Sequence, residues 1–170
     1  IQKAVEHFKA VPGRFEYLRT VCGVKIYNDN SPTTPDATVA ALRALRDLRF
    51  KKYDLGTHKS RIVNRKSDKN IILIAGGTDK GLDMSKLISA IPKYCRAVVL
   101  LKENGTDKLI FNYQFPIYKK DTLKECVDEA MKIAEKGDIV LFSPAFASFG
   151  KWFKNEYDRG EQFVELVSSL

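Results

Sequence analysis

The chain has 170 residues, 44% of them hydrophobic, which suits one globular domain with a full core. It has no apolar run long enough to span a membrane and no recognisable signal peptide, so we expect no membrane association. The three cysteines are an odd number and lie far apart, which indicates buried free thiols rather than disulfides or metal ligands.

The net charge of +8 invites comparison with nucleic-acid-binding proteins. Most of the excess lies in residues 51–69, which hold seven Lys or Arg against two Asp. This segment has few aromatic residues, whereas single-strand binders stack bases on aromatic side chains. We therefore favour a basic connecting loop of unknown role and keep a nucleic-acid interaction domain as an alternative.

The N-terminal part predicts a short helix and a β-hairpin. Residues 2–10 have the apolar spacing of an amphipathic helix. Phe15–Val21 and Val24–Tyr27 flank a Cys-Gly pair and predict two strands joined by a tight turn. The polar loop that follows ends in Thr34 as a helix cap and Pro35 as the first residue of the next helix.

The rest of the chain alternates between apolar runs and amphipathic segments. Residues 71–75, 96–101 and 139–142 predict buried strands, and Leu109–Ile117 is expected to be partly extended. Thr122 and Glu125 have the spacing of a capping box. A closing helix has an apolar stripe made of Phe163, Leu166, Val167 and Leu170.

This alternation predicts an α/β fold, with a Rossmann-like, mostly parallel sheet of about six strands flanked by helices. The first strand is expected to be an antiparallel edge. Residues 1–170 form a single domain on this interpretation.

Polar loops follow three of the predicted strands, after Tyr27, Ala75 and Phe142. Because the carboxyl ends of parallel strands share one edge, we expect these loops to converge on a ligand site. Gly76 and Gly77 allow a sharp turn there, and Lys80 adds a cation.

The glycine-rich turn does not match the common phosphate-binding motifs. After Gly81 comes Leu82, where a P-loop needs Lys and then Ser or Thr, and the glycines do not have the dinucleotide spacing. Asp83 is expected to cap the next helix. His7 and His58 have no ligand partners nearby in the sequence, so we predict no metal site.

Four motifs in order resemble the C-terminal domain of the Mur ligases, and the resemblance covers essentially the whole chain. The motifs are residues 12–16 (PGRFE), 28–34 (NDNSPTT), 75–81 (AGGTDKG) and 143–149 (SPAFASF), followed by Arg159-Gly160. Within the family, the chain is most similar to the members that add D-glutamate.

The resemblance implies a cytoplasmic bacterial enzyme of peptidoglycan synthesis. It implies ATP and Mg²⁺ as cofactors of the full enzyme, with neither bound by this domain alone. An acyl phosphate of UDP-N-acetylmuramoyl-L-alanine would be attacked by the amine of D-glutamate. The UDP-binding and ATPase domains of the family are not in this chain, so it is expected to be an inactive fragment with no catalytic residue. The resemblance implies no nucleic-acid partner.

The resemblance also assigns roles residue by residue. Arg14 and Asp29 match residues that contact the nucleotide, chiefly its ribose. Three residues match those that hold D-glutamate, namely Thr33, Lys80 and Ser148. Lys80 is then an electrostatic and positioning group rather than a nucleophile.

The chain departs from the family pattern in places. Ser31 stands where lysine is common, and Phe146 where cysteine is common. The chain has one residue more than the family pattern after Ser148, and we assign this extra residue to Trp152. The position of the family's aromatic contact to D-glutamate then falls at Glu156 or Tyr157, and Tyr157 is carried over as that contact. Two further alternatives remain: a stand-alone module that binds nucleotide or phosphate, and a sibling ligase with another acceptor amino acid.

Overall fold

A mixed sheet lies at the centre of the computed structural model, which describes residues 11–51, 69–110 and 114–170. Its strands in chain order are β1 (Glu16–Val21), β2 (Val24–Asn28), β3 (Ile71–Ala75), β4 (Cys95–Leu101), β5 (Ile117–Lys120) and β6 (Ile139–Phe142). Their order across the sheet is β1-β2-β6-β3-β4-β5. Only β1 is antiparallel to its neighbour, so the prediction of a mostly parallel sheet with an antiparallel first strand is confirmed.

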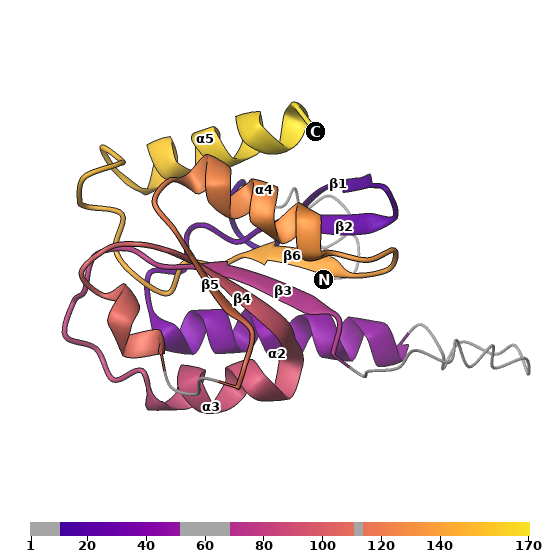
Figure 1. Cartoon of the computed structure of the whole chain (residues 1–170), viewed down its shortest axis with the longest axis horizontal. Coiled ribbons are helices and arrows are strands. Elements are labelled where there is room, and N and C mark those ends of the chain that lie inside the picture. Colours follow the sequence, from indigo (N-terminus) through magenta and orange to yellow (C-terminus); the bar gives the residue numbers. More distant parts are fainter. Residues whose placement is uncertain (1–10, 52–68, 111–113) are drawn as a thin grey trace, which may run out of the picture.

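Helices cover both faces of this sheet, as Figure 1 shows. One face carries α2 (Pro35–Lys51) and α3 (Ser85–Tyr94), and the other carries α4 (Leu123–Ile133) and α5 (Glu156–Ser168). A short 3₁₀ helix, η1 (Thr106–Leu109), follows β4. The described part of the chain has no helix long and apolar enough to cross a membrane.

Strand β3 shows why the apolar runs lack polar alternation. Its residues Ile71 to Ala75 are all buried, because helices lie on both faces of the strand. Leu73 packs into the core beneath α2 and α3, while Ile72 and Ile74 pack into the core beneath α4 and α5. A strand that separates two apolar cores needs hydrophobic residues at every position.

The predicted start of α4 is confirmed, whereas the cap of α3 lies one residue after the predicted Asp83. Thr122 and Glu125 form both bonds of the capping box that opens α4. Asp83 lies one residue before the cap position, which Met84 occupies, yet its Oδ1 accepts a 2.9 Å hydrogen bond from the Ser85 amide. The carboxylate therefore satisfies a free amide of the first turn, as expected for an acidic residue at a helix start.

Other expectations were wrong. Leu109 belongs to the η1 helix rather than to an extended segment, and β5 begins only at Ile117, the last residue of the predicted stretch. Residues 111–113 of that stretch lie outside the described residues. The final helix ends at Ser168, and Leu170 is exposed rather than part of the core. The helix expected at residues 2–10 and most of the basic segment 51–69 lie outside the described residues.

The cysteines do not all lie in the core. Cys95 and Cys126 are buried, and desolvation raises the pKa of both thiols, that of Cys126 to about 12. Cys22 is exposed, contrary to the expectation for all three cysteines. It occupies the turn between β1 and β2, where its φ of 50° and that of Gly23 at 80° let the chain reverse tightly.

The two glycines after β3 let neighbouring backbones come into contact. Gly76 has a φ of 126°, and a Cβ atom there would lie 2.4 Å from the Leu101 carbonyl oxygen. Gly77 has a φ of 145°, and its Cβ atom would lie 2.4 Å from the Ala147 carbonyl oxygen. No larger residue fits either position without moving the end of β4 or the loop after β6.

Replacing Gly76 by Ala should lower the free energy of unfolding by more than about 3 kcal/mol, since it combines backbone strain with a clash against a carbonyl oxygen. Gly81→Ala is the matched control, because Gly81 also has a positive φ of 71° but faces open space. It should cost only about 1–2 kcal/mol. Urea unfolding measures both values, and equal costs would show that the contact with Leu101 is unimportant.

Candidate functional site

Backbone hydrogen bonds join the loops at the carboxyl ends of the parallel strands. The Asp29 amide donates to the Phe142 carbonyl at 2.8 Å, and the Gly76 amide donates to the Pro144 carbonyl at 3.0 Å. Thr78 and Ala147 exchange two backbone hydrogen bonds of 3.0 and 3.2 Å. The three loops that the sequence predicts to converge therefore do converge.

Lys80 and Thr33 meet at this edge. The Lys80 ammonium donates a 3.0 Å hydrogen bond to the Thr33 hydroxyl, although the two residues come from the loops after β3 and β2. The ammonium keeps two further protons to donate. Because the Thr33 oxygen accepts this bond, its own proton is available to an incoming acceptor.

Ser148 adds a second hydroxyl, from the loop after β6. Its side chain is 4% exposed, and its Oγ has no hydrogen-bond partner among the described residues. The residue before it, Ala147, is held against Thr78, two positions from Lys80. A buried hydroxyl without a partner is uncommon in folded proteins.

Asp29 has a different environment from these three. It is 4% exposed, and its Oδ1 and Oδ2 accept hydrogen bonds from the Phe15 amide at 2.9 Å and the Ser143 hydroxyl at 2.8 Å. The Ser143 hydroxyl also lies 2.9 Å from the hydroxyl of buried Thr38, at the start of α2. Burial raises the pKa of Asp29, while Ser143, Phe15 and then Arg14 oppose the rise.

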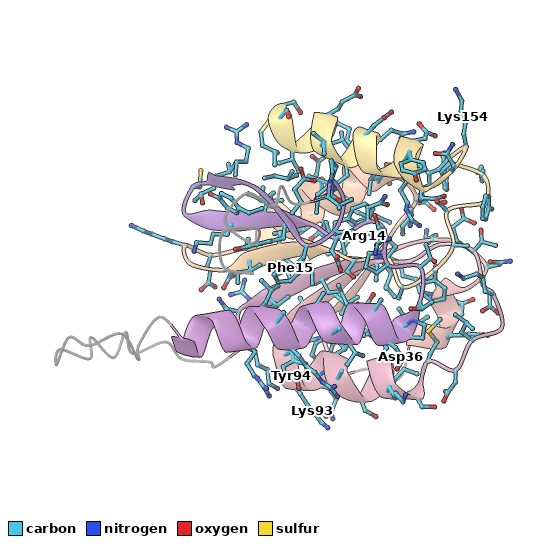
Figure 2. The ribbon with its side chains drawn as sticks, turned by 180° about the vertical axis from the view of Figure 1, so that it is seen from behind. Arg14, Phe15, Asp36, Lys93, Tyr94 and Lys154 are labelled. Carbon is cyan, nitrogen blue, oxygen red and sulfur yellow. The ribbon has the colours of Figure 1, made fainter. Side chains whose placement is uncertain are left out.

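Arg14 is exposed and lies close enough to Asp29 to lower the pKa of that carboxyl. In Figure 2 it lies towards the same end of the molecule as Asp36 and Lys154. Phe15 beside it has a φ of 49°, an unusual value for a bulky residue, and its amide is the one bound by Asp29. The Asp29 carboxylate thus holds the loop that carries Arg14.

The remaining predicted residue, Tyr157, is 74% exposed at the start of α5. It lines a groove of about 460 Å³ between α5 and the loop around Gly13. The sequence did not single out Phe149, which directly follows Ser148, is 65% exposed and accepts a hydrogen bond from the Thr78 hydroxyl through its carbonyl. Among the described residues, no group of three His, Cys, Asp or Glu could hold a metal ion.

A buried guanidinium lies beneath these loops. Arg159 is 1% exposed, and burial lowers its pKa to about 10. Its Nε donates to the Asn30 side-chain oxygen at 2.6 Å, Nη2 to the Asn30 carbonyl at 3.0 Å and Nη1 to the Phe146 carbonyl at 3.3 Å. Sequence reasoning assigned no role to Arg159, although a charge four residues before Phe163 in the apolar stripe of α5 is a signal for it.

Comparison with known proteins gives relatives along the whole chain. In an alignment of 171 positions that covers 98% of this chain, it is 37% identical to the UDP-N-acetylmuramoylalanine–D-glutamate ligase of Borreliella afzelii. It is 34% identical over 175 residues to the enzyme of that name from Caldanaerobacter subterraneus. No protein-family model matches.

The chain belongs to the Mur ligase family. It spans about a third of the length of the curated relatives that it matches.

Solved structures agree with a Mur ligase fold. A domain from Haemophilus ducreyi, assigned to a UDP-N-acetylmuramate:L-alanyl-gamma-D-glutamyl-meso-diaminopimelate ligase, superposes with a TM-score of 0.57 at 16% identity. That match covers 92% of this chain and 98% of the domain. The murein peptide ligase of Psychrobacter arcticus gives a TM-score of 0.56 at 11% identity, with 99% of this chain and 32% of that one covered.

Replacing Asp29 by Asn should remove a pH dependence of stability. With a folded-state pKa raised above 3.8, the folded protein takes up a proton before the unfolded chain does as the pH falls. As the pH falls from neutral to about 4, the free energy of unfolding of the wild type should therefore rise relative to that of Asp29→Asn. Urea unfolding at several pH values measures the difference, and the opposite trend would show a lowered pKa.

Replacing Arg159 by Lys in this Mur ligase domain should lower the free energy of unfolding by about 2–4 kcal/mol. Lysine keeps the buried charge but cannot reach all three acceptors. The control is Arg19→Lys, because Arg19 is exposed and donates to the Val167 and Ser168 carbonyls at the other end of α5. Its cost should stay within about 0.5 kcal/mol, and a similar cost for both variants would contradict the role of the buried network.

Proposed function

We propose that this chain is the C-terminal domain of an ATP-dependent ligase that joins D-glutamate to UDP-N-acetylmuramoyl-L-alanine. The observation that carries the proposal is the meeting of the Lys80 ammonium and the Thr33 hydroxyl at 3.0 Å, on the edge that also holds the unpartnered Ser148 hydroxyl. One cation and two hydroxyl donors suit the carboxylates of an amino-diacid. The identity to named D-glutamate ligases along the whole chain supports this substrate.

In the proposed reaction, ATP with Mg²⁺ supplies the phosphoryl group that activates the substrate carboxylate. The residues of this chain would bind and orient D-glutamate so that its amine reaches the activated carbonyl carbon. A C–N bond forms, phosphate leaves and the amine loses a proton. Lys80 contributes charge and position, since holding the two reactants in line lowers the barrier without a covalent step on the enzyme.

Arg14 and Asp29 are the proposed nucleotide contacts. The exposed guanidinium of Arg14 suits phosphate or ribose oxygens. Asp29 already accepts two hydrogen bonds and is 4% exposed, so its larger contribution would be to hold the loop that presents Arg14. Tyr157 is proposed as the aromatic contact to D-glutamate, which its 74% exposure leaves available.

The rest of the proposed enzyme would supply the UDP-sugar site and the ATPase centre, because this chain has no P-loop. We place the enzyme in the bacterial cytoplasm. A ligase of this kind explains the site better than a stand-alone nucleotide-binding module, since the Lys80–Thr33–Ser148 edge offers donors for carboxylates while Asp29 is largely engaged inside the protein.

Replacing Lys80 by Ala in the whole ligase should raise the KM for D-glutamate by about 10- to 100-fold, the effect of one lost charge-assisted hydrogen bond. The KM for ATP should change little. Steady-state kinetics measures both constants, with the exposed Lys93→Ala on α3 as the control for lost charge. An unchanged KM for D-glutamate in Lys80→Ala would remove Lys80 from the proposed site.

A further inference from the structure

The backbone around Lys80 is closed by the residue before it. The Asp79 side-chain Oδ1 accepts a 2.9 Å hydrogen bond from the Gly81 amide, so an Asx turn spans Lys80. Such a turn sets the direction in which the central side chain leaves the backbone. The rotamer of Asp79 therefore sets the direction in which the Lys80 side chain leaves the backbone.

Asp79 is itself held from two sides by the segment that follows β4. Its amide donates a 2.9 Å hydrogen bond to the Asn104 side-chain oxygen, and its Oδ2 lies 2.6 Å from the Lys108 ammonium. The hydrogen bond from Lys108 lowers the pKa of Asp79, followed by the bond from the Gly81 amide. The carboxylate is thus kept ionised and can accept both bonds at neutral pH.

The same segment is fixed to the sheet. The Gly105 amide donates to the Gly77 carbonyl at 3.3 Å, and the buried Thr106 hydroxyl donates to the Leu101 carbonyl at 2.7 Å. Lys108 therefore extends from a short helix that is tied to the end of β4. It can transmit that rigidity to the loop after β3 through Asp79.

We propose that Lys108 and Asn104 are positioning residues for the Lys80 ammonium. Lys108 holds the Asp79 carboxylate in the rotamer that forms the Asx turn, and Asn104 fixes the Asp79 backbone amide. The turn then directs Lys80 towards the Thr33 hydroxyl at 3.0 Å. The inference rests on the proposed function, because it assumes that Lys80 binds D-glutamate. A lysine that is already aimed at its ligand loses less freedom on binding than one on a loose loop.

The energetics distinguish this role from a purely structural one. The Lys108 and Asp79 side chains are 42% and 25% exposed, and ion pairs at such positions contribute little to global stability. Loss of the pair should leave the melting temperature within about 2 °C of wild type. A change in D-glutamate binding without a change in stability is therefore the expected signature.

The test compares Lys108→Met, Lys108→Arg and Asn104→Ala in the ligase that carries this chain. Lys108→Met and Asn104→Ala should each raise the KM for D-glutamate by about 5- to 20-fold with kcat and the KM for ATP within about twofold. Lys108→Arg should leave the KM for D-glutamate close to that of the wild type, since arginine keeps a cation that can pair with Asp79. Hydrogen exchange of the Gly81 amide in the 170-residue chain should become faster in Lys108→Met and Asn104→Ala.

Lys119→Met is the matched control. Lys119 forms a comparable surface pair with Asp107 on the same short helix at 2.9 Å but does not touch Asp79. Its KM for D-glutamate should stay within about twofold of wild type. An equal rise in this control would show a general charge effect and overturn the proposal.

Lys80→Ala separates this inference from the function on which it depends. If Lys80→Ala leaves the KM for D-glutamate unchanged, the proposed function fails. If Lys80→Ala raises that KM but Lys108→Met and Asn104→Ala do not, the proposed function stands and the positioning role is overturned.

Discussion

The site depends on one buried cation, the guanidinium of Arg159. It extends from α5 and binds the loop after β2 through the Asn30 side chain and carbonyl, and the loop after β6 through the Phe146 carbonyl. The hydrogen-bond acceptors are all neutral oxygens, although the nearby carboxylate of Glu156 also favours the charged form of Arg159. An arrangement of this kind requires well-placed acceptors, which makes the loop conformations interdependent.

Small residues make that arrangement geometrically feasible. A Cβ atom on Gly160 would lie 2.9 Å from the Asn30 side-chain nitrogen, so helix α5 can approach the loop after β2 only with glycine there. Gly76 and Gly77 allow the corresponding approach of the loop after β3 to the end of β4 and to the loop after β6. The rigid part of the site is therefore backbone and buried polar groups, while Lys80, Thr33 and Arg14 lie at its accessible surface.

The sheet and most helices could be predicted from the sequence because their signals are local. The apolar runs of β3 and β6 and the capping box of α4 each depend on a few neighbouring residues. The bonds of Asp79 to Asn104 and Lys108 could not be predicted in this way, because they join residues 25 to 29 positions apart and have no periodic pattern. The same holds for Ser143 and Thr38, whose hydroxyls meet only in the folded chain.

The hairpin turn between β1 and β2 has a practical consequence. Thiolates react with alkylating agents and thiols do not, so the raised pKa values and burial of Cys95 and Cys126 leave those side chains chemically inert near neutral pH. Cys22 is exposed on that turn, at the end of the sheet opposite the converging loops. Among the three cysteines of this chain, Cys22 is thus the one open to a fluorescent or spin label, and a distance measured from it would report how this part of the protein moves without altering the converging loops.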